Sequence, residues 1–287
     1  MTKRAGVIGH PLTHSISPAI FKAAFDAAGI DATYEAWDTE PDVLQGRIDA
    51  LRGSDFLGAN VTIPHKTAVV PMLDSTSDLA STAGAVNTIV HSDGKLVGHN
   101  TDVAGFSRAL REDAGFDAKG KRTMLLGSGG AARAVALALM QMNPSVIYVV
   151  SRHPNKIDAM VVSLKKGTPA GTTLSWAYWG DGSYLRSLAE ADLIVNCTPL
   201  GVAGSDTAGQ SPIPAELIQP KTTVFDLVYN PMETPFVAAA KSRGAKAISG
   251  LGMLVYQAAE SFKLWTAQDA DIASMRAAAE LSLAPNA

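Results

Sequence analysis

A glycine-rich turn between a strand and a helix is the feature that most limits the folds open to this chain. Residues 123–126 are short and apolar, residues 127–130 read Gly-Ser-Gly-Gly, and residues 131–142 are rich in alanine and leucine. Residues 146–150 have the pattern of a second strand, which completes a β-α-β unit of about 30 residues. Parallel strands joined in this way are buried on both faces, so the sequence predicts an α/β domain around this unit.

Strand-like and helix-like segments alternate along the rest of the chain, as an α/β fold requires. We predict further strands at residues 5–8, 33–37, 58–63, 193–196, 224–227 and 246–249, and a hairpin of residues 85–91 and 95–100 around Asp93-Gly94. We predict helices at residues 17–28, 43–52, 65–73, 101–111, 251–265 and 272–281. The first helix is expected to have Ser17 as its N-cap and to end at Gly29.

Length and charge exclude several classes of protein. At roughly 150 residues per domain, 287 residues predict about two domains. The 24 Lys and Arg against 27 Asp and Glu give a net charge of −3, which excludes a protein that grips nucleic acid through a basic field. The single cysteine, Cys197, excludes an internal disulfide and a multi-cysteine zinc site. Without an apolar run of about 20 residues, we expect a soluble, cytoplasmic protein with neither nucleic acid nor membrane as partner.

The glycine turn matches the dinucleotide-binding pattern G-x-G-x-x-A. Glycine lets the backbone approach a pyrophosphate, and the free N–H groups at the start of the following helix favour an anion. The predicted cofactor contacts in this turn are Gly127, Ser128, Gly129, Gly130 and Ala131. The alternative is a tight strand-to-helix turn that binds no ligand.

The end of the second strand indicates which dinucleotide is bound. NAD sites usually place Asp or Glu there to accept hydrogen bonds from the ribose. This chain instead reads Ser151-Arg152-His153, and a guanidinium suits the dianionic 2′-phosphate of NADP. We therefore predict NADP as the cofactor, with Ser151 and Arg152 in its site; the alternative for Arg152 is a solvated loop charge.

Polar side chains gather at predicted strand ends in the first hundred residues, where a hydrophobic core has no need of them. They are Ser15 and Ser17, then Asn60, Thr62 and Lys66, then Asn87, and finally Asp102. Each has a structural explanation alone, such as an N-cap, a surface lysine or a carboxylate at a helix start. Because ligands bind beyond strand ends in open α/β sheets, the four groups together predict a small-molecule substrate site.

Seven strings in this order cover nearly the whole chain and resemble the shikimate dehydrogenase family. They are VIGHPLTHSISP, GANVTIPHK, GAVNT, NTDVAGF, LLGSGGAARA, DLVYNP and GLGMLVYQAAESFKLWT. The resemblance implies the reversible NADPH-dependent reduction of 3-dehydroshikimate to shikimate, a step toward chorismate and the aromatic amino acids. It also implies a substrate domain with a mixed sheet from residues 1–104 and 251–287, a Rossmann domain from residues 105–250, and a cleft between them.

The resemblance also implies a role for each matching residue. Ser15, Ser17 and Thr62 would hold the substrate carboxylate; Asn60, Asn87 and Gln257 would bind ring hydroxyls; Lys66 and Asp102 would be the catalytic pair and touch the substrate; Tyr229 would lie near the carboxylate and the nicotinamide ribose; and Thr198 and Gly250 would lie beside the cofactor. The family usually has Asn-Arg-Thr or Asn-Arg-Ser where this chain has residues 151–153, but Arg152 is retained.

The chemistry of a ketone reduction explains why a lysine and a carboxylate are needed. Hydride delivery to carbon leaves an alkoxide that needs a proton, and an ammonium beside the oxygen stabilises it and donates. We predict Lys66 as the main acid and base with Asp102 as its partner. The alternative has Asp102 as the proton acceptor and Lys66 as a purely electrostatic group. No metal is expected, because the lysine supplies the positive charge and the cofactor supplies the hydride.

Other interpretations stay open from the sequence. Relatives within the family act on quinate or aminoshikimate and use NAD or NADP. A non-catalytic NADP-binding homologue is a further alternative, although such a chain would be expected to lose Lys66 or Asp102. The protein is expected to be a monomer or a homodimer.

Overall fold

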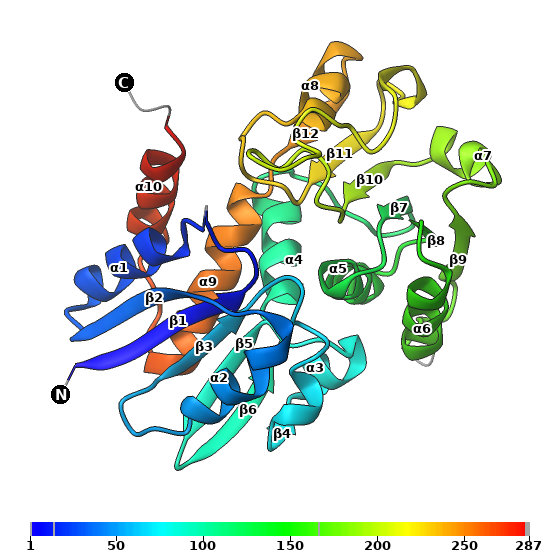
Figure 1. The fold of residues 1–287 in the computed structure, drawn as a ribbon. Coiled ribbons are helices and arrows are strands. Elements are labelled where there is room, and N and C mark those ends of the chain that lie inside the picture. Colours follow the sequence, from blue (N-terminus) through cyan, green and yellow to red (C-terminus); the bar gives the residue numbers. More distant parts are fainter. Residues whose placement is uncertain (1, 14, 166, 285–287) are drawn as a thin grey trace. The chain divides into compact units, whose positions relative to one another are not determined.

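The chain forms two compact units in the computed structural model, which describes residues 2–13, 15–165 and 167–284. Unit 1 comprises Met1–Gly105 and Val255–Ala287, and unit 2 comprises Phe106–Leu254 (Figure 1). The chain enters unit 2 within helix α4 (Asp102–Glu112) and returns to unit 1 within helix α9 (Leu251–Thr266).

Unit 1 is built on a mixed sheet of six strands in the order β2-β1-β3-β5-β6-β4. Strand β1 is parallel to β2 and β3, whereas β5 is antiparallel to β3 and β6. Besides α4 and α9, the elements are β1 (Lys3–Gly9), α1 (Ser17–Ala28), β2 (Ala32–Asp38), a 3-10 turn (Pro41–Val43), α2 (Leu44–Ala50), β3 (Gly58–Val61), a 3-10 turn (Val70–Met72), β4 (Ser75–Thr76), α3 (Asp78–Ala83), β5 (Thr88–Ser92), β6 (Lys95–His99) and α10 (Ile272–Leu283). The predicted hairpin is confirmed, with Ser92 paired to Lys95 across Asp93-Gly94.

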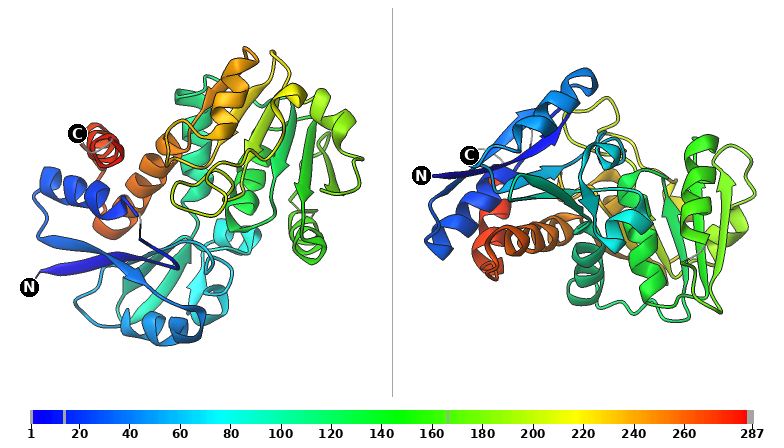
Figure 2. Two further views of the ribbon diagram at one scale, coloured as in Figure 1. Left: turned by 45° about the horizontal axis from the view of Figure 1, so that its top comes forward. Right: turned by 90° about the horizontal axis from the view of Figure 1, so that it is seen from below.

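Helices cover both faces of this sheet. Helices α2 and α3 pack on one face through a buried cluster that includes Ile48 and Ala80. On the other face, Phe21 of α1 stacks on Tyr34 of β2 at 4.2 Å and lies 5.2 Å from the ring of Trp265 in α9. Helix α10 packs beside α1 (Figure 2). These aromatic contacts join α1 and β2, near the start of the chain, to α9.

Three local expectations for unit 1 were wrong. Ser17 is the first residue of α1 rather than its N-cap; Ile16 holds that position, and no side chain caps the helix. The predicted helix at residues 65–73 is a run of turns with one 3-10 segment. Strand β3 ends at Val61, so Thr62 lies beyond it. In the segment at residues 65–73, Val69 is fully buried in the core and anchors an irregular backbone rather than a helix.

Unit 2 is a parallel sheet of six strands in the order β12-β11-β10-β7-β8-β9, as the predicted Rossmann domain requires. Its remaining elements are β7 (Arg122–Leu126), α5 (Gly130–Gln141), β8 (Val146–Ser151), α6 (Pro154–Lys165), β9 (Thr173–Tyr178), α7 (Leu185–Ala189), β10 (Leu193–Asn196), a 3-10 turn (Ala215–Leu217), β11 (Thr223–Asp226), α8 (Pro235–Ser242) and β12 (Lys246–Ile248). The sequence analysis did not predict α6 or β9, although the buried residues of α6 recur at helical spacing and large apolar residues alternate along β9.

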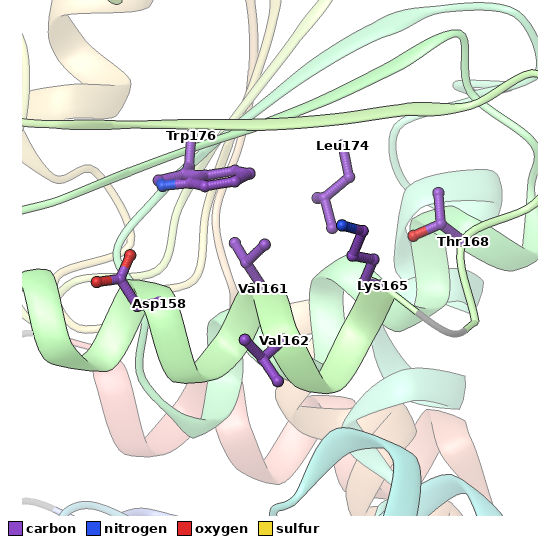
Figure 3. Close-up of a pocket in the computed structure, with 7 residues that line it drawn as sticks. All are labelled: Asp158, Val161, Val162, Lys165, Thr168, Leu174 and Trp176. Carbon is purple, nitrogen blue, oxygen red and sulfur yellow. The ribbon is translucent and has the colours of Figure 1, made fainter.

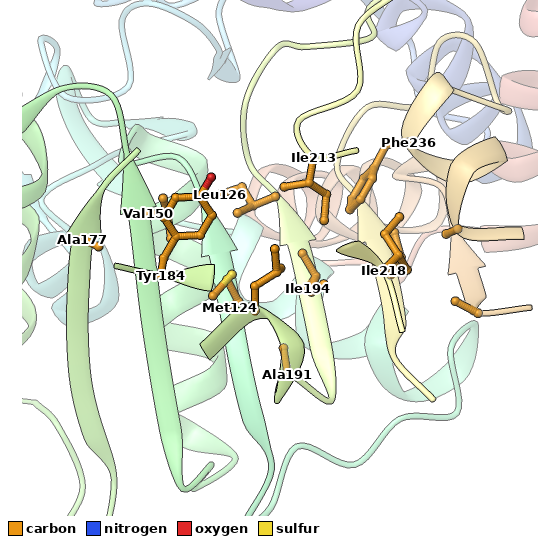
Figure 4. Packing of buried hydrophobic residues seen from close by; sticks show 14 residues of the cluster. Met124, Leu126, Val150, Ala177, Tyr184, Ala191, Ile194, Ile213, Ile218 and Phe236 are labelled. Atoms are coloured by element: carbon orange, nitrogen blue, oxygen red, sulfur yellow. The ribbon is translucent and has the colours of Figure 1, made fainter. Parts of the chain in front are cut away.

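One hydrophobic cluster of unit 2 lies on the face of the sheet that carries α7 and α8. Met124, Ile194 and Phe236 belong to a buried cluster contributed by strands and by these helices (Figure 4). On the opposite face, the ring of Phe106 in α4 lies 5.1 Å from that of Phe225 in β11. The order of strands reverses between β7 and β10, and open parallel sheets bind ligands at the carboxyl ends of strands at such a point.

The helices of the described residues do not include one with the length and apolar character that a membrane span needs.

Candidate active site

Lys66 and Asp102 form a tight, largely buried ion pair in unit 1. Lys66 lies in the turn after β3, and Asp102 is the first residue of α4. The Lys66 Nζ donates to Asp102 Oδ2 at 2.5 Å, and only 15% and 5% of the two side chains are exposed. Asn87 Nδ2 donates to the other carboxylate oxygen at 2.9 Å. Both oxygens of Asp102 therefore have donors, and the predicted catalytic pair is held in one arrangement.

The turn that carries Lys66 is fixed by its neighbours. The amide of Val86 donates to the Lys66 carbonyl at 2.7 Å, which ties the turn to the segment before β5. The His65 ring is 1% exposed, and its Nε2 lies 2.7 Å from the Thr39 carbonyl. This nitrogen carries the proton, because a carbonyl only accepts. His65 acquires a structural role here that the sequence did not reveal.

Asn87 connects the ion pair to helix α9. Its Nδ2 lies 2.8 Å from Thr101 Oγ1 and 3.2 Å from Gln257 Oε1 on α9, and its Oδ1 accepts from the Thr101 amide at 2.7 Å. The structure thus brings together Lys66, Asp102, Asn87 and Gln257 from four separate parts of the sequence. Thr101 was missed, although it stands directly before Asp102.

Asn60 faces inward in a buried network. Its Oδ1 accepts from the Tyr34 hydroxyl at 2.8 Å, and its Nδ2 lies 2.9 Å from Ser261 Oγ and 3.1 Å from Thr88 Oγ1. The side chain is 6% exposed. Asn60 therefore joins β2, β5 and α9 beneath the ion pair, and its contact with a substrate hydroxyl stays a prediction. Sequence patterns did not point to Tyr34, Thr88 or Ser261, because their partners are distant along the chain.

The three residues predicted to hold a carboxylate lie on segments that follow neighbouring strands. Ser15 is in the loop after β1, and Ser17 opens α1. Thr62 follows β3 and donates its amide to the Ile8 carbonyl of β1 at 2.8 Å. All three are half-buried, and their joint use on one carboxylate stays a prediction.

The glycine turn of unit 2 leaves room for a dinucleotide. Gly127 adopts a φ of 121°, and a side chain there would meet the Cys197 carbonyl at 3.1 Å, so only glycine fits without strain. Gly129 is the N-cap of α5, and a Cβ on it would meet nothing within 4 Å. The space before the helix N-terminus, with its free N–H groups, fits the pyrophosphate of the predicted cofactor.

The residues at the end of β8 also fit the predicted cofactor, NADP. Ser128 and Ser151 share a buried hydrogen bond of 2.7 Å between their hydroxyls, which ties the glycine turn to β8. The His153 amide donates to Ser151 Oγ at 3.2 Å. Arg152, between them, is exposed, and residues 151–153 include no carboxylate. An exposed guanidinium at this position fits a 2′-phosphate.

A buried carboxylate organises the loops that follow β10 and β11. Asp226 Oδ1 accepts from Asn196 Nδ2 at 2.8 Å, and its Oδ2 accepts from Thr234 Oγ1 at 2.6 Å. The Asn196 Oδ1 in turn accepts from the hydroxyl of Thr198 at 2.6 Å. Thr198, predicted to lie beside the cofactor, is thus positioned by Asn196 and Asp226, which the sequence analysis did not single out.

Tyr229 and Gly250 complete the predicted set in unit 2. Tyr229 is half-buried, and burial raises the pKa of its phenol. A Cβ on Gly250 would lie 2.1 Å from the Leu227 carbonyl, so packing against the backbone alone demands glycine here. The cofactor contact that the resemblance implies for Gly250 stays a prediction.

Asp226 gives unit 2 a distinct pH dependence. Burial raises the pKa of its carboxyl from 3.8 to about 6, against three hydrogen bonds that lower it. The folded chain therefore keeps this proton at pH values where the unfolded chain has lost it, so this group's stabilising contribution falls as pH rises. We expect the free energy of unfolding to lose about 3 kcal/mol from this group between about pH 4 and pH 6.

The matched control is Asp226→Asn, which cannot titrate. Denaturant unfolding of both proteins across this pH range should show the wild type losing stability relative to the variant as pH rises. A difference between the two proteins that does not change with pH would contradict the expectation.

Two family models match parts of the chain. The model described as the shikimate dehydrogenase substrate binding domain matches residues 7–89. The model described as the shikimate 5′-dehydrogenase C-terminal domain matches residues 250–280.

Curated relatives and solved structures match over nearly the full length. A Moorella thermoacetica protein named shikimate dehydrogenase (NADP(+)) is 43% identical over 96% of this chain and 91% of its own length. Shikimate 5-dehydrogenase from Thermus thermophilus, in complex with NADP(H) and shikimate, has a TM-score of 0.86 at 37% identity, covering 98% of this chain and 100% of that one. Quinate dehydrogenase from Corynebacterium glutamicum, in complex with NAD, has a TM-score of 0.85 at 30% identity, covering 96% and 98%.

Proposed function

This chain belongs to the shikimate dehydrogenase family of NADP-dependent oxidoreductases, and we propose how its own residues carry out the reversible reduction of 3-dehydroshikimate to shikimate. The contact between Lys66 Nζ and Asp102 Oδ2 carries the proposal, because it places an ammonium beside a carboxylate among amide side chains that suit a polyhydroxylated ring.

Lys66 stabilises the substrate oxygen and supplies its proton. In the reducing direction the carbonyl oxygen gains negative charge, and the Lys66 ammonium donates to it. Asp102 holds the ammonium in place and accepts a hydrogen bond from a neighbouring substrate hydroxyl. Asn87 donates to Asp102, so the carboxylate keeps its orientation while Lys66 exchanges its proton. In the oxidising direction the same lysine, once neutral, receives the hydroxyl proton.

Substrate recognition follows from the groups around this pair. Gln257 and Asn87 lie within hydrogen-bonding distance of each other, and each could turn part of its amide to a ring hydroxyl. Ser15, Ser17 and Thr62 would supply hydroxyl groups to the carboxylate of the substrate. The contact of Tyr229 with the substrate carboxylate, which the family resemblance implies, stays a prediction.

The residues of unit 2 hold the dinucleotide. The N-terminus of α5, with Gly127–Gly130 before it, fits the pyrophosphate, and Arg152 suits the 2′-phosphate. Thr198 and Gly250 would lie along the nicotinamide half. When bound, NADPH supplies the hydride.

The second candidate is a quinate dehydrogenase that uses NAD, since a structure of that description also matches. Arg152 favours the first candidate, because a guanidinium in place of a carboxylate selects for the 2′-phosphate.

Initial rates of nicotinamide reduction decide between the candidates. The purified protein is assayed with shikimate, quinate or no substrate, each with NADP and with NAD. We expect turnover with shikimate and NADP to exceed every other pair. Greater turnover with quinate and NAD would establish the second candidate, and no turnover with any pair would contradict both.

Arg152→Ala extends the same assay to the cofactor. We expect the KM for NADP to rise by about tenfold to 100-fold, because the variant loses a charge-assisted contact with the 2′-phosphate. We expect little change in kcat or in the weak activity with NAD. Arg243→Ala, which removes an exposed arginine after α8, is the control and should leave both KM values unchanged. Equal effects of Arg152→Ala on the two cofactors would contradict the role in phosphate recognition.

A further inference from the structure

Strand β9 is an edge strand without the usual protection. It ends the sheet order of unit 2 and pairs only with β8, so its other side has no strand partner among the described residues. Its sequence Thr-Leu-Ser-Trp-Ala-Tyr has no charge and no proline. Trp176 is 45% exposed and Tyr178 is 40% exposed. Natural proteins normally protect such an edge by a short strand, charged side chains or proline, because an open edge can pair with a strand of another chain.

The other sheet edges of the described chain follow that rule. Strand β4 has two residues, and β12 has three and begins with Lys246. Strand β2 is seven residues long but carries Glu35, which pairs with Arg4, and ends at Asp38. The contrast within one molecule indicates that the open edge of β9 has a partner.

An exposed stripe on α6 continues the surface of β9. Leu174 and Trp176 project from the strand toward the helix, where they line a surface groove with Val161 (Figure 3). Asp158 and Lys165 lie on α6 on either side of Val161. Val162, between the two charges, is 73% exposed. Asp158, Val162 and Lys165 share one face because they are four and three residues apart.

The charges on this stripe are self-complementary. Asp158 and Lys165 are separated by about 10 Å along the helix, and neither side chain belongs to an ion pair among the described residues. If a second α6 lies antiparallel beside the first, each Asp158 meets the partner's Lys165, and the two Val162 side chains meet at the centre. A two-fold axis produces this pairing twice.

We propose that β9 and α6 form the interface of a homodimer, in which β9 pairs antiparallel with the β9 of a second copy and the two α6 helices pack antiparallel over it. One two-fold axis perpendicular to the sheet satisfies both pairings, because it reverses strand and helix direction together and leaves both helices on the same face. The two six-stranded sheets become one sheet of twelve strands. The inference does not depend on the proposed function.

Sedimentation equilibrium of the full chain tests the interface. The wild type should have twice the 29.9 kDa mass of one chain. Val162→Glu and Trp176→Glu should each raise the dimer dissociation constant by about 100-fold or more, since each places two unpaired charges at the apolar centre. Leu281→Glu is the matched control, because it changes an aliphatic residue that is 79% exposed on α10, in unit 1 rather than unit 2, and it should leave the dimer intact.

Charge reversal tests the orientation of the helices. Asp158→Lys and Lys165→Asp should each weaken the dimer by about tenfold through like-charge contacts at two symmetric places, and the double variant should restore it. Circular dichroism melting of each variant establishes that it is folded. A monomeric wild type, or a dimer unaffected by Val162→Glu and Trp176→Glu, would overturn the interface; single reversals without recovery in the double variant would overturn the antiparallel pairing.

Discussion

Lys66→Met is expected to lower kcat for shikimate oxidation by about 10³-fold, with a much smaller change in the KM for NADP. Methionine keeps the length of the side chain and its apolar stem but has neither positive charge nor proton. The variant therefore loses both the stabilisation of the developing alkoxide and the proton transfer, which together account for rate factors of this size. Steady-state kinetics with shikimate and NADP measure the effect.

Two controls make this result specific. Lys22→Met removes an exposed lysine of α1 that pairs with Asp26, and it should retain wild-type kinetics. Lys66→Ala should regain part of its activity when ethylamine is added, because a small amine can occupy the space left by the side chain. Near-full turnover of Lys66→Met would exclude Lys66 as the acid and base.

Asp102→Asn is expected to lower kcat by about 100-fold and to raise the KM for shikimate. The substitution keeps the shape of the side chain but removes the negative charge that holds the Lys66 ammonium at 2.5 Å. It also places an amide next to Asn87 Nδ2, which now donates to the carboxylate at 2.9 Å. Lys66 remains present in this variant, so its activity should exceed that of Lys66→Met by about tenfold.

The double variant Lys66→Met/Asp102→Asn distinguishes the two possible assignments of the proton-transferring group, Lys66 or Asp102. If Asp102 acts through Lys66, the double variant should be no slower than Lys66→Met alone, because residues that act as a unit are not additive. If Asp102 is itself the proton acceptor and Lys66 is only electrostatic, Asp102→Asn should be the more damaging single change. That outcome would reverse the roles proposed for the pair.

The elements that sequence predicted well are those with strong local signals. The glycine turn after β7, the parallel strands around it and the hairpin at Asp93-Gly94 all follow from turn chemistry and apolar runs. The prediction of a helix at residues 65–73 was wrong because the apolar residues of this segment pack on the core from an irregular backbone. Periodicity alone cannot distinguish a helix from such a segment. Helix α6 and strand β9 were not predicted, although the apolar residues of each have the spacing of a half-buried helix or strand.

The residue types of the site could be named from the sequence, but the arrangement could not. Lys66, Asn87 and Asp102 stood out because polar residues at strand ends have no structural purpose as a group. Ser261 did not, since nothing in its helix distinguishes a serine that reaches Asn60 from one that faces solvent. The structural role of His65 was likewise not predicted, because its hydrogen bond to the Thr39 carbonyl forms only in the folded chain.

The sequence by itself determined the α/β class, the dinucleotide turn, the absence of a carboxylate after β8 and the family, because each depends on residues that are close together in the chain. Only the tertiary structure decided that Lys66 meets Asp102 across 36 positions, that Asn87 meets Gln257 across 170, and that β9 is an open edge. Those contacts depend on the order in which strands pair and on how α9 packs against them. Both are set by the burial of apolar surface over the whole domain, which no local segment encodes.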